Sequence, residues 1–194
     1  MRKVKPQNAY RALLNFVSKE AVRPILKGFH VTYDGHIEAT NGHILLRLLN
    51  RMPTNQERTI EPKELQEIKG DYLNTDRIIP TDHNAIWVLD PTEAPAIVKF
   101  LKSFSKGSLV DVSVKNHELM IAGFRDAQST FGLLDHSGDE IKFRCNVNYL
   151  CYLMVFIADC ALLPVKIRLL SPIKAVVFEG ENQFIGLLMP VTKN

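Results

Sequence analysis

One pattern of predicted elements recurs along the chain and restricts how it can fold: a strand, a helix and then three further strands. In the clearest copy, residues 85–89 form an apolar strand, and the helix that follows has apolar residues at i, i+3, i+4 and i+7 from Ile97. Asp90 and Pro91 are expected to begin this helix and Gly107 to end it. The three strands are predicted at residues 109–115, 118–122 and 128–134, with a loop at 135–138.

A second copy follows directly. Residues 140–145 form a predicted strand, Asn146 is a suitable N-cap, and residues 147–158 form an apolar helix. Its remaining strands are predicted at residues 165–170, 175–178 and 184–189. Residues 81–194 therefore hold the repeated unit twice and are expected to form one complete domain.

Residues 1–80 fit the same unit less completely. A helix is predicted at residues 7–19, and strands at 25–33, 37–40 and 44–49. Asp34-Gly35 and Asn41-Gly42, between those strands, are typical hairpin turns.

A further copy should then begin with an extended pair at 59–60 and a short helix at 61–69, but residues 71–80 leave no room for its strands. The chain thus contains about three and a half copies of the unit. A boundary is expected near residues 81–84, and the first domain is truncated.

Composition excludes several classes of protein. A formal net charge of +3 permits an anionic partner but provides no dense basic stripe. Cys145, Cys151 and Cys160 are an odd number without metal-ligand spacing, so they are expected to be reduced thiols of a cytoplasmic protein. Residues 1–5 are basic but lead into no signal-peptide core, and the apolar stretch 147–158 is too short to cross a bilayer. We expect no membrane association, metal or cofactor.

The sequence also contains no catalytic motif. His43 lies beside a turn, and no Ser or Cys stands in a nucleophile elbow. There is no suggestive pair of carboxylates and no phosphate-binding glycine loop. A non-catalytic role is therefore expected.

Five segments, in chain order, carry a family resemblance. Residues 23–28 lead into the first long strand, and Thr40-Asn41-Gly42-His43 resembles a Thr-Asp-Gly-His turn. Asp76-Arg77-Ile78-Ile79-Pro80 resembles an interdomain connector, residues 143–150 a Phe-Asn-Val-x-Tyr-Leu helix entry, and residues 188–191 a terminal Val-Met-Pro-Met. The family is the bacterial DNA sliding clamp, the beta subunit of DNA polymerase III. The chain aligns with the second and third domains of that clamp.

This resemblance implies an α+β DNA clamp, or processivity, fold, in which repeated β-α-β-β-β motifs place helices on the inner face and antiparallel sheets outside. It also implies three kinds of partner: double-stranded DNA bound without regard to sequence, DNA polymerase and other replication proteins bound through short peptide motifs, and a clamp loader. The family's ring is a dimer of three-domain protomers. Because this chain lacks the first domain, we expect a homo-oligomer, with a trimer favoured over a dimer.

The resemblance further implies a peptide-binding groove between the two domains. Its expected lining is Leu26, Thr40, Gly42, His43, Leu45, Arg77, Ile78, Leu187, Leu188, Met189, Pro190 and Val191. Ile44 stands where the family commonly has Arg, so one polar contact differs. Simpler interpretations also fit: Gly42 as an ordinary hairpin glycine, Arg77 as a support for the connector, and residues 188–191 as a final core strand.

The candidate DNA-binding residues are basic and belong to the predicted helices or the loop after the first one. They are Arg11, Lys19, Arg23, Lys99, Lys102 and Lys106. Lysines on a solvated helix face would give the same pattern. The helix at 147–158 carries no Lys or Arg, which weakens the case for a basic channel.

Two functions from different classes remain open. The first is a sliding clamp that encircles duplex DNA and tethers a polymerase through the groove. The second is a monomeric clamp-fold adaptor or competitor that binds replication-protein peptides without encircling DNA. A shortened clamp from a virus or mobile element would also fit the truncation. The oligomeric mass in solution distinguishes the first two functions.

Overall fold

Each half of the chain contributes its own strands and at least one helix. The N-terminal unit begins with helix α1 (Pro6–Leu13) and the 3-10 turn η1 (Pro24–Lys27). Its strands are β1 (Phe29–Val31), β2 (Ile37–Thr40), β3 (Ile44–Leu48) and β4 (Arg58–Ile60). The computed structural model describes residues 6–52, 54, 56–124 and 126–192, so the basic residues 1–5 lie outside it.

Residues 61–84, called the connector below, lead from β4 to the C-terminal unit and contain a second 3-10 turn, η2 (Thr75–Arg77). The next copy of the repeat comprises β5 (Ala85–Leu89), α2 (Ala94–Leu101), β6 (Leu109–Lys115), β7 (Glu118–Ala122) and β8 (Gln128–Gly132), followed by β9 (Asp135–Gly138). The last copy comprises β10 (Phe143–Asn146), α3 (Val147–Cys160), β11 (Val165–Leu169), β12 (Val176–Gly180) and β13 (Phe184–Leu188). The α+β class and the repeated unit are therefore confirmed.

The two copies in the C-terminal unit exchange their leading strands. β5 of the first copy pairs with β11 of the second, and β10 of the second pairs with β6 of the first. The second pairing completes a four-stranded sheet in the order β10-β6-β7-β8. Because each copy completes the sheet of the other, the two copies form one structural unit.

One antiparallel sheet runs through both units. Its nine strands lie in the order β4-β1-β2-β3-β13-β12-β11-β5-β9. β3 and β13 pair across the two units, with Ile44 opposite Leu188 and Leu48 opposite Phe184. This pairing is called the seam below. The units are thus joined by a strand ladder as well as by the connector.

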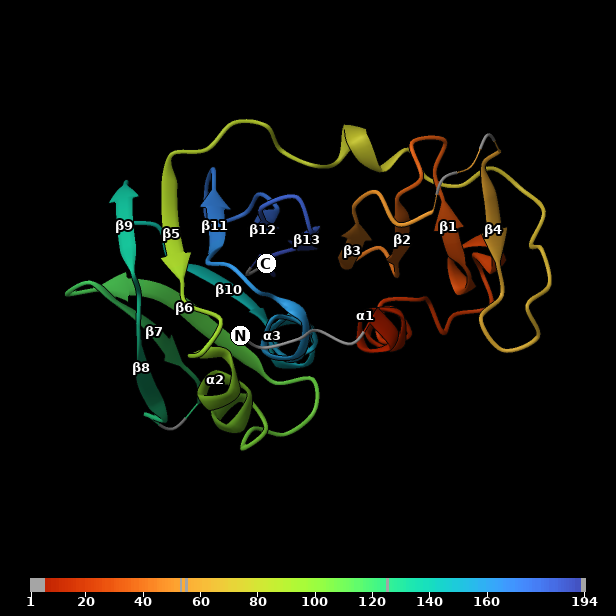
Figure 1. Cartoon of the computed structure of the whole chain (residues 1–194). Coiled ribbons are helices and arrows are strands. Elements are labelled where there is room, and N and C mark those ends of the chain that lie inside the picture. Colours follow the sequence, from red (N-terminus) through yellow and green to blue (C-terminus); the bar gives the residue numbers. More distant parts are fainter. Residues whose placement is uncertain (1–5, 53, 55, 125, 193–194) are drawn as a thin grey trace.

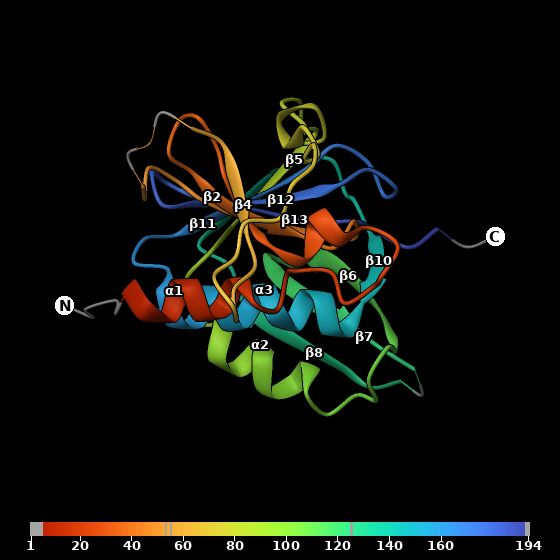
Figure 2. The ribbon, with the colours of Figure 1, turned by 90° about the vertical axis from the view of Figure 1, so that its right-hand side faces the viewer.

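The helices α1, α3 and α2 lie side by side on one face of the long sheet, and the connector crosses the opposite face (Figures 1 and 2). α3 contacts both of the other helices. Buried side chains such as Phe16, Ile97 and Leu153 fill the space between the helices and the sheet. The helix-covered side is called the inner face below, and the side that the connector crosses is called the outer face.

Residues 61–69 do not form the predicted helix. The Glu61 carboxylate accepts hydrogen bonds from two backbone N–H groups, at 2.6 and 2.7 Å, and so closes a single turn. Leu65 then takes a left-handed φ of 57°, and the Ile68 N–H donates to the Thr59 carbonyl at 2.8 Å. Leu65 is 77% exposed, so the segment has no apolar face to bury as a helix. Of the predicted half copy, the described residues therefore form the strand β4 but no helix.

Other predicted elements are placed differently in the structure. α1 ends at Leu13 because i to i−3 hydrogen bonds tighten the chain into a 3-10-like turn over residues 14–16. The predicted strand at 25–33 begins later, because Pro24 opens η1. Residues 135–138, predicted to be a loop, pair with β5 as strand β9. Gly138 allows this pairing, since its φ is 88° and an added Cβ would lie 2.0 Å from a backbone oxygen of the neighbouring chain segment.

The predicted caps show one success and one correction. The Asn146 side chain accepts from the Asn148 N–H at 2.9 Å and caps α3 as expected. Asp90 instead caps a turn that precedes α2, accepting from the Thr92 N–H at 2.9 Å. α2 ends at Leu101, several residues before the predicted Gly107 stop.

Candidate functional site

The seam places an apolar surface on the outer face of the long sheet. Strand alternation sends Ile44, Leu46 and Leu48 of β3 into the helix-covered core, so Leu45 points outward. Leu187 of β13 lies opposite Leu45 and points the same way. Together with Ala175, these residues provide the floor of a depression between the two units.

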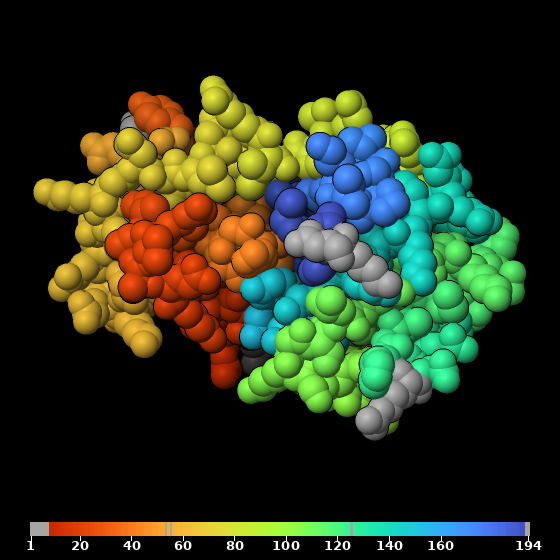
Figure 3. Space-filling model, turned by 180° about the vertical axis from the view of Figure 1, so that it is seen from behind, coloured from red at the N-terminus to blue at the C-terminus, as the bar shows by residue number. Residues whose placement is uncertain are grey.

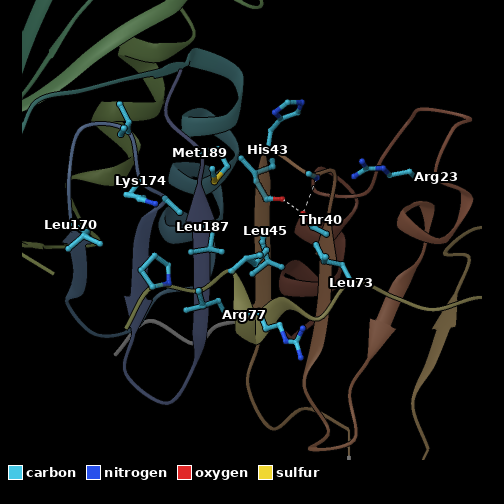
Figure 4. Close-up of a pocket in the computed structure, with 17 residues that line it drawn as sticks. Arg23, Thr40, His43, Leu45, Leu73, Arg77, Leu170, Lys174, Leu187 and Met189 are labelled. Carbon is cyan, nitrogen blue, oxygen red and sulfur yellow. Dashed lines mark hydrogen bonds between the residues drawn. The ribbon is translucent and has the colours of Figure 1, made fainter. Parts of the chain in front are cut away.

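This depression is a cleft with a volume of about 580 Å³ (Figure 4). It is lined from both units and from the connector between them, which runs along the top of both units in Figure 3. The lining consists of Arg23, Thr40, Gly42, His43, Ile44, Leu45, Leu73, Arg77, Ile78, Ile79, Pro80, Leu170, Ile173, Lys174, Ala175, Leu187 and Met189. An apolar concavity with a few polar groups at its edge is typical of a site that binds a peptide or small molecule.

The β2–β3 turn forms one fixed edge of the cleft. The Thr40 hydroxyl donates to the Ile44 carbonyl at 2.7 Å and accepts from the Gly42 N–H at 3.1 Å. The Asn41 side chain accepts from the His43 N–H at 2.9 Å. Gly42 has a φ of 89°, which favours glycine in this turn. The His43 ring is thus held at the rim, where it stacks on Tyr149 of α3 with ring centroids 5.6 Å apart.

Arg47 fixes the connector on the N-terminal unit. Its guanidinium donates to the carboxylates of Glu38 at 2.8 Å and Asp76 at 2.6 Å, and also to the Thr75 hydroxyl. Thr75 in turn donates to the Glu38 carboxylate at 2.9 Å. Glu38 is only 1% exposed; burial raises its pKa and the charge of Arg47 opposes that shift. The ionised form of a carboxylate buried in this position is stabilised by its partner, Arg47.

An aromatic stack holds the connector a few residues earlier. The rings of His30 on β1 and Tyr72 on the connector lie parallel, 4.2 Å apart. The His30 Nδ1 lies 3.0 Å from the Thr59 hydroxyl, within hydrogen-bonding distance. Burial lowers the pKa of His30, which favours the neutral ring.

Arg168 on β11 holds the other end of the connector. Its guanidinium donates to the carbonyls of Pro80 and Thr81, each at 3.1 Å, and to the Glu179 carboxylate at 3.1 Å. Arg47 and Arg168 therefore fix the connector at two points, one on each unit. Arg77 and Ile78 lie between those points in the chain and form a wall of the cleft. Figure 4 shows Arg77 at this wall.

The structure brings most of the predicted groove residues together. Those that line the cleft are Thr40, Gly42, His43, Leu45, Arg77, Ile78, Leu187 and Met189. Met189 is 41% exposed at its edge. Their predicted role in binding a peptide stays a prediction.

Four predicted groove residues do not line the cleft. Leu188 is 0% exposed because it alternates with Leu187 and points into the inner core. Leu26 is buried within η1. Pro190 and Val191 lie beyond the cleft, where the Val191 N–H donates to the Arg144 carbonyl of β10 at 2.7 Å.

Several lining residues were missed by the sequence prediction. They are Leu73, Ile79, Pro80, Leu170, Ile173, Lys174 and Ala175, whereas Ile44, which stands where the family commonly has Arg, also lines the cleft. Ile79 and Pro80 belong to the connector motif already recognised, so the motif itself was an available signal. Leu73 and the turn after β11 carried no local signal, because long-range contacts bring them to the cleft.

The candidate DNA-binding residues separate into two groups. Arg11, Lys19, Lys99, Lys102 and Lys106 are exposed on or beside α1 and α2. Burial raises the pKa of Cys151 on α3, and the charge of Lys102 opposes that shift. Arg23 lies instead at the cleft, because the chain after α1 crosses toward the seam. The central helix α3 presents no cation.

The described residues contain three thiols and no metal-binding cluster. No group of three or more His, Cys, Asp or Glu among them is placed to hold a metal ion. Cys145 is buried, and burial raises the pKa of its thiol, which keeps it protonated. Among the residues that the structure describes, no helix is both long and apolar enough to cross a membrane.

The arrangement of helices and strands defines the fold class of the protein. Copies of a β-α-β-β-β unit, with helices on one face and a continuous antiparallel sheet on the other, make the DNA clamp fold that the sequence motifs led us to expect. No family model and no curated protein matches the sequence.

Solved structures do match it, over the whole chain. The beta subunit of DNA polymerase from Streptococcus pyogenes matches with a TM-score of 0.78 and 16% identity, covering 100% of this chain and 68% of that one. The sliding clamp of Bacillus subtilis matches with a TM-score of 0.81 and 15% identity, covering 100% and 67%. The clamp of Bartonella birtlesii, solved bound to griselimycin, gives 0.72 and 15%, covering 95% and 64%. The chain thus has the fold of bacterial sliding clamps and spans about two thirds of their length.

Proposed function

We propose that this protein is a DNA sliding clamp, a non-catalytic processivity factor that encircles duplex DNA and tethers a polymerase through the cleft at the seam. The observation that carries the proposal is the apolar cleft itself, about 580 Å³ in volume, between two units of a chain with the clamp fold. Tethering turns polymerase rebinding into an intramolecular event with a high effective concentration. The protein would act in the cytoplasm, where a clamp loader would place it on DNA.

The inner face is the proposed DNA surface. Lys99 is exposed on α2, Lys102 is exposed at the C-cap of α2, and Arg11 is exposed on α1. Contacts from such side chains to phosphates hold a duplex without reading its bases, so the protein would remain free to slide. Encirclement of a duplex would require a closed ring, and we propose a homo-oligomer, with a trimer favoured over a dimer.

The first experiment measures topological retention on DNA. The protein is loaded on a nicked circular plasmid with the loader and replicative polymerase of its source, and the plasmid is then cut once. A clamp stays bound to the circle and is released on linearisation. Equal loss from circular and linear DNA, together with a monomeric mass at tens of micromolar, would contradict encirclement and favour the monomeric adaptor.

Charge reversal tests the DNA surface. The double variant Lys99→Glu/Lys102→Glu should lose retention and show a weaker salt dependence, because two phosphate contacts are removed. A matched control, Lys115→Glu/Lys166→Glu, changes the net charge equally on strands β6 and β11. Retention that falls equally in both variants would reject the inner face as the DNA surface.

The cleft is tested with the C-terminal peptide of the polymerase. Met189→Ala should weaken binding by about 1–3 kcal/mol, the magnitude of an interface hot spot. Leu163→Ala is the control, since Leu163 is similarly exposed but lies outside the cleft lining. Unchanged affinity of a folded Met189→Ala variant would reject the cleft as the peptide site.

A further inference from the structure

We infer that the cleft selects an acidic peptide, in which Asp or Glu side chains flank the apolar residues that fill its floor. This inference rests on the proposed function of the cleft as a peptide site, and it names the chemistry of the partner. The distribution of charge around the floor supports it.

Cations surround the cleft without any opposing acid in its lining. Arg23, Arg77 and Lys174 line it, and none of its other described lining residues is Asp or Glu. Together these side chains carry three positive charges at one site, whereas the formal net charge of the whole chain is only +3. The cleft is therefore a local concentration of positive charge on a nearly neutral protein.

These cations have no internal partners among the described residues. No salt bridge or side-chain hydrogen bond joins Arg23, Arg77 or Lys174 to another described residue. By contrast, two arginines on strands of the long sheet have acidic partners: Arg47 pairs with Glu38, and Arg168 pairs with Glu179. The sheet thus neutralises its structural arginines, whereas the charges at the cleft remain available to a ligand.

The three cations come from separate elements and lie on different sides of the apolar floor. Lys174 belongs to the turn between β11 and β12, Arg77 to the connector, and Arg23 to the segment before η1. In Figure 4, Lys174 lies on the opposite side of Leu187 and Leu45 from Arg23. A bound peptide would therefore meet a cation on each side of its apolar residues, so acidic side chains on both flanks fit better than a single terminal charge.

Such pairs would form at the rim of the site. Because all three cations are exposed, each pair contributes modestly to affinity and strongly to association rate, specificity and salt dependence. A neutral peptide would still place its apolar side chains on the floor. A basic peptide would meet repulsion on both flanks.

The test uses three peptides that share one apolar Leu- and Phe-containing centre. Their flanking residues are Glu, Gln or Lys, and both termini are capped so that they carry no charge. We expect the Glu peptide to bind roughly fivefold more tightly than the Gln peptide at low salt, as two exposed ion pairs would provide. The Lys peptide should bind most weakly, and the differences should shrink in 0.5 M salt, where the Debye length is about 4 Å. A Gln peptide with a free C-terminal carboxylate shows whether a terminal charge suffices.

Lys174→Glu provides the variant, and Lys166→Glu provides a control of equal charge change outside the cleft lining. Lys174→Glu should abolish the preference for the Glu peptide, whereas Lys166→Glu should keep it. Equal binding of the Glu and Gln peptides to the native protein, or a full effect of the free carboxylate alone, overturns the inference and leaves the proposed peptide site standing. Failure of all peptides to bind overturns both the inference and the peptide-binding part of the proposed function.

Discussion

Two regions on the outer face of the long sheet are built in opposite ways. Over the N-terminal unit, outside the cleft lining, that face is polar and covered: Glu38 and Arg47 of the sheet form a buried network with Thr75 of the connector. Near the seam the face is apolar and open, with Leu45 and Leu187 at the floor of the cleft. The connector therefore has two roles: it covers the first surface and forms a wall of the second.

The units also complete their cores differently. In the C-terminal unit two copies of the repeat exchange β5 and β10, so each copy closes the other. The N-terminal unit has one copy and the added strand β4, and its helix α1 packs on α3 of the other unit. The N-terminal unit therefore depends on the seam and the connector for contacts that a second copy provides elsewhere. Three predictions test this difference, in order of decreasing expected effect.

The largest effect is expected from Arg47→Met. It removes the partner of the buried Glu38 carboxylate and should lower the free energy of unfolding by about 3–5 kcal/mol, measured by denaturant titration. Arg144→Met is the comparison, since it breaks a more exposed pair with Asp111 in the C-terminal unit and should cost less. Adding Glu38→Gln to Arg47→Met should recover part of the loss. A larger effect of Arg144→Met would contradict the dependence of the N-terminal unit on the buried pair.

The next effect separates two neighbouring residues at the end of β13. Leu188→Ala should lower the free energy of unfolding by about 2–5 kcal/mol, because Leu188 fills the inner core. Met189→Ala should leave stability nearly unchanged, since its side chain lies at the cleft edge. Thermal denaturation of both variants checks the contrast. A stable Leu188→Ala protein with impaired peptide binding would restore Leu188 to the groove.

The smallest effect is a difference in acid sensitivity. Burial lowers the pKa of His30 below 6.5, so the unfolded state binds the proton more readily. The N-terminal unit should therefore lose stability as the pH falls below about 6.5. The pKa of Asp111 is lowered to about 2, chiefly by its hydrogen bond from Arg144. The contribution of Asp111 to the stability of the C-terminal unit should therefore persist at mildly acidic pH and be lost as the pH falls from about 4 toward 2.

Two local probes can measure the acid sensitivity of each unit separately. Amide hydrogen exchange in β1 and β2 reports on the N-terminal unit, and the fluorescence of Trp87, buried in β5, reports on the C-terminal unit. His30→Gln should reduce the loss near pH 6 in the first probe and leave the second unchanged. The loss that remains would come from His36, whose pKa is also lowered by burial. Loss of both signals together near pH 6 would show that the units do not differ in this respect.

Local chemistry made much of the fold predictable. Asp34-Gly35 and Asn41-Gly42 mark hairpins in the sequence, and both glycines take the left-handed φ that such turns require. Asn146 marks the start of α3 for an equally local reason. The helix expected at 61–69 failed because its favourable start at Glu61 is followed by no apolar face that could pack.

The candidate site was predictable only where it coincides with local motifs. The turn at Thr40 and the connector at Arg77 were both recognisable in the sequence and both reach the cleft. Which of Leu187 and Leu188 faces outward depends on the register of β13 against β3, a pairing between distant segments. Leu73 was missed for a similar reason, because Arg47 and Arg168 fix the connector from far along the chain.

The most direct test of a peptide site at the seam is a methyl NMR titration of the Leu-, Ile- and Met-labelled protein with the Glu-flanked peptide. The methyl signals of Leu45, Leu187 and Met189 should shift together and saturate, while those of the inner-core residues Leu13 and Leu101 stay in place. Saturating shifts confined to the helix-covered face, with the seam methyls unmoved, would contradict the proposal that the cleft receives the partner.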